Sequence, residues 1–441
     1  MNEGMEAVLS KRERPVQHLR MRRFGQSVVP IYGMLFAMQC ARSMFIVLVS
    51  WFALQITGET ASVGKVLICW QLLAFTVGPF IGPLLDRFHR RTMFAIGETI
   101  HGMGVALLAV IASAHPPGHT PITVLYSAAC FISVGSLLSY PSSQALLQRA
   151  AVGPLVRIVS FGIFCAQVGN IVGAALGGLC LPLAGVATGL SICAVSSFLA
   201  VAFASFLNLG EHHIRPEHHN RHLQDLVRGL LETVRHSRLK VAGCALLLAY
   251  ASAHASNALL AGFARYELKL SPDLYGWIAA MYSGGGLIGS VVLAKFSGVA
   301  TERVFISVGS ILLAAATAAF STSRTFAEAV LWQGCIGLSF MMVRVGSDVT
   351  VLRTVPNRMV GRVRSNIDAG IGLTAILIYL LPSIATDIGA RQIFLGLSCV
   401  FACGSCGILW MQRDMAAAEL RRHHDRVDET PPCAGEEEME P

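Results

Sequence analysis

The chain has 441 residues, of which 54% are hydrophobic and only 14% are charged, and its formal net charge is +8. Soluble domains carry about 25% charged residues, so this composition excludes an ordinary soluble domain with one aqueous core. A membrane protein with many spans accounts for the apolar surface. The basic residues lie in short loops and form no continuous face, so the positive charge indicates membrane topology and not nucleic-acid binding.

Apolar runs long enough to cross a membrane follow one another along the chain. The first 28 residues are polar and basic, and the run after them is too long and begins too late for a cleavable signal peptide. A transmembrane helix needs about 20 apolar residues. Twelve spans are predicted near residues 29–54, 61–82, 92–114, 121–145, 155–180, 184–208, 240–263, 274–297, 302–322, 327–348, 366–386 and 391–412. The predicted fold is an all-helical membrane protein with twelve transmembrane helices.

The longest polar segment, from about Gly210 to Arg238, divides the predicted spans into two groups of six. Apolar residues at helical spacing from Leu223 to Leu239 indicate an amphipathic helix on the inner leaflet, and a soluble linker helix is an equal alternative. The predicted organisation is a cytoplasmic tail at 1–28, a six-helix half at 29–208, a linker at 209–239, a second six-helix half at 240–412, and a disordered tail at 413–441.

Loop charges predict the orientation of the spans. With a cytoplasmic N-terminus, the inner loops carry most of the arginines and lysines, and the outer loops of the first half carry almost none. Cytoplasmic loops are the ones enriched in basic residues. Both termini and the linker are therefore predicted to be cytoplasmic.

Five histidines in the linker are candidate metal ligands because histidine clusters can hold a metal. No cysteine or carboxylate completes a four-ligand set at characteristic spacing. We expect no metal site, and whether the linker binds a metal stays open. The histidines are His212, His213, His218, His219 and His222.

The short loop Gly82–Arg91 joins two predicted spans and is strongly cationic. The loop resembles the one between helices 2 and 3 of the major facilitator superfamily. The matching residues are Gly82, Leu84, Asp86, Arg87, Arg90 and Arg91. His89 stands where that family usually has a second glycine. A plain topology anchor is the alternative interpretation.

Further stretches extend this resemblance over nearly the whole chain. The run Gly169–Gly178 is similar to a motif of antiporter branches, with Ala174 in place of a proline, and small residues at this spacing also permit close helix packing. The stretches Trp51–Gly58 and Pro356–Val363 look like the branch that contains the enterobactin exporter and macrolide and other drug efflux proteins. The resemblance implies two six-helix halves related by an axis along the membrane normal.

Polar side chains inside the spans are the candidate cavity residues, because a charge within the bilayer normally faces a cavity or a partner. Gln39 and Arg42 lie three residues apart in the first span, and His254 and Asn257 lie three apart in the seventh. In the family that the chain resembles, these two spans line the central cavity. An internal polar network without ligand contact is the alternative.

Glu98 and His101, also three residues apart, are the candidate proton-coupling pair in the third span. A carboxylate buried beside an imidazole can exchange protons near neutral pH, because burial penalises its charged form. A static structural pair is an equal alternative.

Charged residues at the predicted cytoplasmic ends are candidate gating residues. In an outward-open state the inner ends of the two halves must meet, which places Asp86 near the start of the span after Pro356. A helix start favours a nearby anion, so Asp86 is expected to contact it. The full set is Asp86, Arg87, Arg90, Arg91, Arg344, Asp348, Arg362 and Arg364.

The predicted function is secondary active transport, as proton-coupled export of an amphipathic small molecule such as a siderophore or an antibiotic. Arg42 at mid-depth suits an anionic or metal-chelating substrate. An importer or a lipid translocator on the same fold is one alternative. A membrane sensor that has lost transport is another, which the Asp86 loop disfavours.

No nucleotide-binding loop and no nucleophile-base set is found, so neither an enzyme, nor an ATP-driven pump, nor a cofactor is expected. The expected partners are a small-molecule substrate, protons as the coupling ion and the lipid bilayer, without nucleic acid. The resemblance implies the inner membrane of a bacterium. The oligomeric state stays open, with a functional monomer as one alternative.

Overall fold

The computed structural model describes residues 3–115, 119–150, 155–207, 236–296, 301–355, 357–385 and 387–428. Side chains are described for all of these except 3–28, 78–87, 155–157, 357–362 and 418–428. Within the described ranges the chain is helical between short connections and contains no strand.

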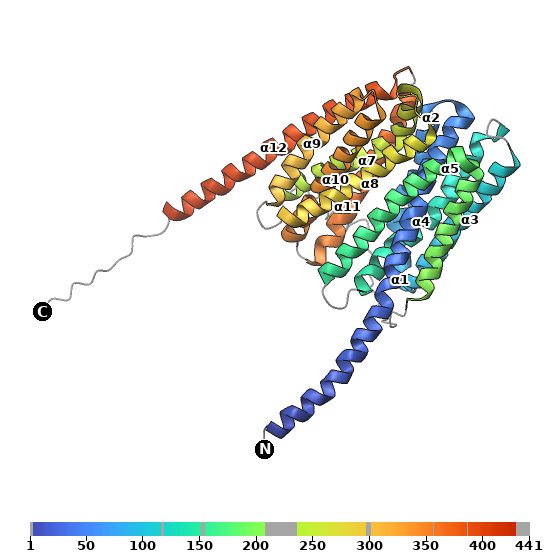
Figure 1. The fold of residues 1–441 in the computed structure, drawn as a ribbon. Coiled ribbons are helices and arrows are strands. Elements are labelled where there is room, and N and C mark those ends of the chain that lie inside the picture. Colours follow the sequence, from blue (N-terminus) through green and yellow to red (C-terminus); the bar gives the residue numbers. More distant parts are fainter. Residues whose placement is uncertain are drawn as a thin grey trace.

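The helices run up and down along one bundle (Figure 1). Their bounds are α1 Glu3–Thr57, α2 Thr60–Arg87, α3 Arg90–Ala114, α4 Ile122–Ala150, α5 Leu155–Ser205, α7 Ser237–Gly262, the π-helical turn η2 Phe263–Glu267, α8 Pro272–Phe296, α9 Glu302–Thr322, α10 Phe326–Thr354, α11 Asn357–Ile384 and α12 Ala390–Asp428.

Eleven of the described helices are long and apolar enough to cross a membrane. One of them, Ile158–Ser205 within α5, has 48 residues, which is more than two crossings need. It consists of two helices joined at Gly185, where φ is 80°, a conformation that glycine adopts without strain. The predicted all-helical membrane fold is confirmed, and the twelve expected spans correspond to these eleven helices with α5 counted as two.

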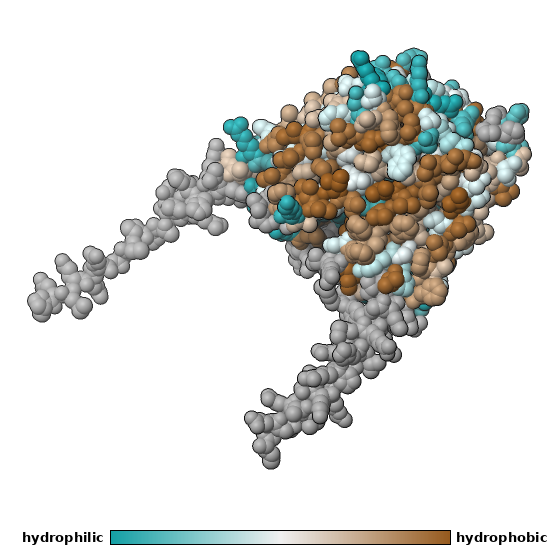
Figure 2. All heavy atoms as spheres, in the orientation of Figure 1, coloured by the Kyte–Doolittle hydropathy of each residue, from teal (hydrophilic) through white to brown (hydrophobic). Residues whose placement is uncertain are grey.

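The flank of the bundle is apolar and exposed. Leu107, Val195 and Val400 are 60%, 64% and 60% exposed, and Figure 2 shows brown hydrophobic side chains along the flank, with teal hydrophilic ones at the end away from the termini. Soluble monomers rarely expose an apolar surface of this extent. A lipid-facing flank accounts for it.

Two sets of helices make up the bundle. Helices α1–α5 contact one another and form the N-set, α7–α12 form the C-set, and the broadest contacts between the sets are α5 with α8 and α2 with α11. Most of the linker between the sets, with its five histidines and most of its predicted amphipathic helix, lies outside the described residues, and its last three residues belong to the start of α7. The predicted domain boundaries therefore stay a prediction.

Close approach of α5 to α1 depends on the glycine run singled out in the sequence. A Cβ atom on Gly169 or Gly173 would collide with the backbone carbonyl oxygen of Phe36 or Cys40 on α1. Small residues at such spacing let helix backbones pack closely within a membrane. The run therefore has a packing role between the first and fifth helices.

Both terminal helices continue past the predicted ends of their spans. Helix α1 begins at Glu3, and α12 extends to Asp428 where a disordered tail was expected from residue 413. The stretch Met415–Leu420 contains three alanines, a glutamate and a leucine, all of which favour a helix. Local propensity therefore explains this difference from the prediction.

Candidate substrate-binding cavity

The bundle has two distinct ends. We call the end toward which both chain termini extend the terminal end, and the opposite one, with the α1–α2 connection, the turn end (Figure 1). Between them, a central cavity of about 320 Å³ is lined by both helix sets. Its wall includes Gln39, Arg42, Tyr140, Asn257, Tyr282 and Gln333.

Three of the four predicted cavity residues lie together in this wall. Gln39 and Arg42 come from α1 and Asn257 comes from α7. His254 is not among the residues that line this cavity. Its Nδ1 atom forms a hydrogen bond of 2.8 Å with the hydroxyl of Tyr379 on α11. Of the two predicted residues on α7, Asn257 lines this cavity and His254 does not.

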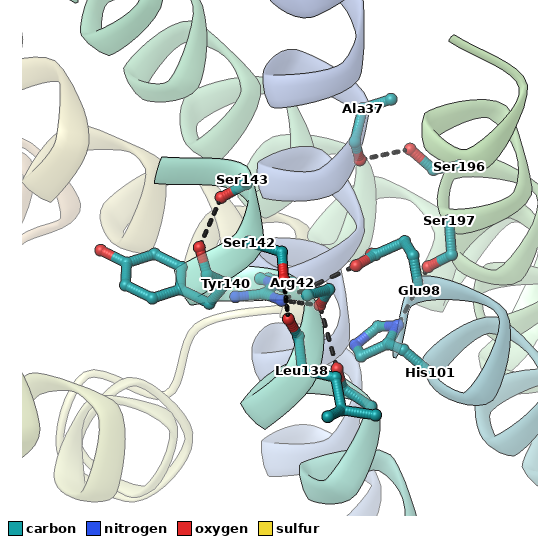
Figure 3. Close-up of polar contacts among 12 residues, drawn as sticks. Ala37, Arg42, Glu98, His101, Leu138, Tyr140, Ser142, Ser143, Ser196 and Ser197 are labelled. Atoms are coloured by element: carbon teal, nitrogen blue, oxygen red, sulfur yellow. Dashed lines mark hydrogen bonds and ion pairs between the residues drawn. The ribbon is translucent and has the colours of Figure 1, made fainter. Parts of the chain in front are cut away.

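Arg42 connects the cavity with the interior of the N-set. Its Nη2 atom donates a hydrogen bond of 2.7 Å to Ser139 Oγ on α4 and lies 3.7 Å from Glu98 Oε2 on α3. Its Cζ atom lies 5.4 Å from the ring centroid of Tyr140. Arg42 thus extends between Tyr140 on one side and Glu98 on the other (Figure 3).

Glu98 is fully buried, and within the described part of the chain neither of its carboxylate oxygens accepts a hydrogen bond. An unpaired buried charge costs several kcal/mol. Burial disfavours the charged form of a carboxyl group, whereas a nearby arginine favours it. The protonation state of Glu98 therefore depends on where the Arg42 guanidinium lies.

His101 is also fully buried, but it is held by another helix. Its Nδ1 atom lies 2.9 Å from Ser197 Oγ in the second arm of α5, and among the described residues its Nε2 atom has no hydrogen-bond partner. No described contact joins His101 to Glu98. The two residues of the predicted proton-coupling pair are neighbours on α3 whose side chains contact different partners.

Sequence reasoning did not foresee the pairing of Glu98 with Arg42, because the two residues lie on different helices far apart in the chain. One signal was available. Opposite charges within the membrane normally pair with one another, and Arg42 and Glu98 are opposite charges in spans of the same predicted half.

The predicted gating residues divide into two groups in the structure. Arg91, at the start of α3, donates hydrogen bonds of 2.9 and 2.6 Å to the carbonyl oxygens of Leu207 and Ser205 at the end of α5. A cation at a helix C-terminus is favourable. The side chains of Asp86, Arg87 and Arg362 lie outside the described residues, as does the predicted contact between Asp86 and the start of α11.

The second group lies on α10 and α11 near the terminal end. Arg364 forms ion pairs with Asp348 at 2.5 Å and with Asp368 at 3.7 Å. The Nε atom of Arg344 lies 4.0 Å from Asp348 Oδ2. Asp348 therefore joins two helices of the C-set, and the proposed gating role of this cluster stays a prediction.

Aromatic and polar contacts join the two helix sets at the turn end. Trp51 of α1 stacks on Tyr275 of α8 with ring centroids 5.6 Å apart, and the Arg265 guanidinium lies 5.8 Å from the Trp51 ring centroid. The Tyr266 hydroxyl donates a hydrogen bond of 2.5 Å to the carbonyl oxygen of Gly58. These contacts hold the turn end closed.

Comparison with solved structures shows the same fold. The chain is similar to a mutant of the nucleoside transporter NupG, with a TM-score of 0.70 and 15% identity over 87% of this chain and 99% of that chain. It is also similar to a POT family transporter in complex with a thioalcohol conjugated peptide, with a TM-score of 0.69 and 12% identity over 89% and 96% of the two chains. At these identities the likeness shows the fold alone.

Comparison of sequences is more specific. A relative from Bacillus subtilis (strain 168), described as an uncharacterized MFS-type transporter YfiS, is 25% identical over 338 residues, which cover 74% of this chain and 78% of the relative. The family described as Major Facilitator Superfamily matches residues 31–252, which is half of the chain. With its all-helical membrane fold and its cavity between two helix sets, this chain belongs to the major facilitator superfamily.

Proposed function

We propose that this transporter moves an amphipathic small molecule with an anionic group, together with a proton. The observation that carries the proposal is Arg42, which lines the central cavity and lies 3.7 Å from the buried carboxylate of Glu98. One guanidinium can serve either the carboxylate behind it or an anion in front of it. Cargo and Glu98 therefore compete for the same cation.

The rest of the cavity wall supports a cargo that is rich in hydrogen-bonding groups. Gln39 Oε1, the Ser256 and Tyr282 hydroxyls and both amide atoms of Gln333 are buried, and none has a hydrogen-bond partner in the described part of the chain. Buried polar groups are normally paired, and a polar cargo would pair them. The volume, about 320 Å³, lies at the lower end of the range for small-molecule sites.

The competition for Arg42 couples the cargo to a proton. When an anionic cargo draws the guanidinium away, Glu98 is left buried without its counter-charge, and protonation relieves the cost. Protonation of Glu98 in turn frees Arg42 for the cargo. Each ligand then raises the affinity for the other, as thermodynamic linkage requires.

This sign of linkage favours co-transport. Cargo and proton bind together, so an inward proton gradient drives uptake. The loop charges predict that the terminal end is cytoplasmic, and on this prediction the closed turn end faces outward. Uptake from the outer side requires that the contacts of Trp51 and Tyr266 separate during the cycle.

Export in exchange for protons, for example of a siderophore or an antibiotic, is the second candidate. The observations that favour it are in the sequence: the glycine run of α5 resembles a motif of antiporter branches, and Trp51–Gly58 and Pro356–Val363 resemble the efflux branch. Export requires that cargo and proton exclude each other. A cargo that places a positive group beside Glu98 would meet this requirement, because it would compete with protonation.

The sign of linkage decides between the two candidates. Full-length protein in liposomes that contain a pH-sensitive dye is exposed to candidate cargoes, such as a catecholate siderophore, an antibiotic with a carboxylate and a nucleoside. We expect inward proton movement with an anionic cargo, and cargo affinity that rises as the pH falls. Cargo affinity that decreases as the pH is lowered supports export.

Two further outcomes contradict the proposal as a whole. If the cargo moves without protons, Glu98 does not couple cargo transport to proton transport. Binding without movement of either species places the chain among membrane sensors. Arg42→Ala protein, after thermal unfolding has verified its fold, serves as the control in each assay, because it lacks the cation.

A further inference from the structure

A second, larger cavity lies at the terminal end of the bundle, away from the central one. It has a volume of about 680 Å³ and is formed between α5 of the N-set and α8, α9 and α10 of the C-set. This volume is within the range of small-molecule sites. Much of its wall is apolar and includes Ile163, Leu293, Phe305, Met341 and Val345.

Arg344 lines this cavity and has hydrogen-bond donors to spare. Its nearest described carboxylate oxygen, on Asp348, is 4.0 Å from Nε, which is too long for a hydrogen bond. Its Cζ atom lies 6.0 and 5.9 Å from the ring centroids of Tyr250 and Phe340. In the described part of the chain, no acceptor receives a hydrogen bond from this guanidinium.

The other charges of the cavity are already paired. Asp348 forms its short ion pair with Arg364. Glu302 forms one of 2.9 Å with Arg353. Of the two arginines in this wall, Arg353 donates a hydrogen bond to Glu302, whereas Arg344 has only the long 4.0 Å ion pair with Asp348 and donates no hydrogen bond within the described residues. Arginine binds carboxylate and phosphate groups through two parallel hydrogen bonds.

We propose that this cavity binds an amphipathic anion, with its acidic group on Arg344 and its apolar part along the wall between Ile163 and Phe305. Two sources can supply this chemistry. One is an anionic lipid of the surrounding membrane, and the other is the transported molecule on its way to or from the central cavity. Binding here does not depend on the direction of transport or on proton coupling, so either proposal can fail without the other.

The test measures binding to the purified full-length protein in a neutral detergent by native mass spectrometry. The probes are dioctanoyl phosphatidylglycerol, dodecyl phosphate and, as the matched probe without net charge, dioctanoyl phosphatidylcholine. We expect at least one of the two anions to bind roughly tenfold tighter than phosphatidylcholine. Arg344→Gln should remove that preference, because a charged hydrogen bond accounts for a factor of about ten or more.

Two further variants distinguish anion binding in this cavity from a general attraction of anions to positive charge. Arg353→Gln makes the same change of charge in the same cavity, but its side chain is 70% exposed and ion-paired, so anion binding should persist. Ile163→Trp narrows the apolar part of the cavity. Ile163 is 46% exposed, so the site has room for the larger side chain. It should weaken binding of the dioctanoyl tails while Arg344 is intact.

The pattern of binding identifies the source. Binding of phosphatidylglycerol alone assigns the site to membrane lipid. Binding of dodecyl phosphate that the transported molecule displaces assigns it to the cargo. Equal binding of phosphatidylcholine and the anions, or a preference for the anions that survives Arg344→Gln, overturns the proposal.

Discussion

Arg42 is the residue on which cargo binding is expected to depend. Arg42→Ala should weaken binding of an anionic cargo by roughly 1.5–3 kcal/mol, because it removes a charge-assisted contact. Equilibrium binding to the purified protein measures this loss. Ser139→Ala is the matched control, because it removes the acceptor of the Arg42 hydrogen bond, together with the bond from Ser139 to the Gly135 carbonyl oxygen, and keeps the charge of Arg42. If cargo affinity is the same in Arg42→Ala and wild type, Arg42 has a structural role only.

Glu98 is the residue on which proton dependence is expected to depend. Glu98→Gln keeps the shape of the side chain and cannot gain or lose a proton, so transport by this variant should change little across a pH series while cargo still binds. Transport rates between pH 5 and 8 provide the measurement. Ser197→Ala alters only the contact of His101 and should keep the wild-type pH profile. A wild-type profile in Glu98→Gln would make Glu98 a static partner of Arg42.

At the scale of helices, the contact between α1 and α5 is set by glycine. Gly173→Ala should destabilise the protein by about 1–3 kcal/mol, because the new methyl group meets the backbone at Cys40 and forces the helices apart. Thermal unfolding in detergent measures the loss. Gly396→Ala on α12 is the matched control, since no atom lies within 4 Å of its added Cβ. Equal stability of both variants would show that α1 and α5 adjust at no cost.

The elements were largely predictable from the sequence because a membrane span needs a long apolar run and little else. The two spans within α5 are separated at a single glycine, Gly185, and the extension of α12 depends on local helix propensity. The candidate site was less predictable. Depth within a span identifies Gln39 and Arg42, but the bond from His254 to Tyr379 and the cavity beside Arg344 arise only when distant helices pack.

For the whole molecule, the turn-end contacts should decide which side is open. Trp51→Ala removes the stack on Tyr275 and the contact with Arg265, both of which the closed turn end contains and an open one lacks. The equilibrium should therefore shift toward the state that is open at the turn end. Spin labels at Glu59 and Asp387, in a variant without other cysteines, should show a longer distance between the two helix sets.

The control for this experiment is Trp277→Ala on the same helix as Tyr275, at a position that is 43% exposed. It removes an equally large side chain and leaves the stack of Trp51 on Tyr275 and the contact with Arg265 in place. An unchanged distance distribution in Trp51→Ala would show that the backbone contact from Tyr266 to Gly58 and the packing of α5 on α8 suffice to keep the turn end closed.

The pairing of Arg42 with Glu98 has an electrical consequence. Without cargo, the positive and negative charges of the pair cancel. With a monovalent anionic cargo on Arg42 and a proton on Glu98, the charges cancel again. A membrane potential of 100 mV changes the free energy of each net charge that crosses the membrane by about 2.3 kcal/mol. In this scheme no net charge crosses, either with cargo or without it. Voltage imposed with potassium and valinomycin should leave the transport rate unchanged, so the carrier should keep working in a cell whose membrane is depolarised, for as long as a pH difference remains.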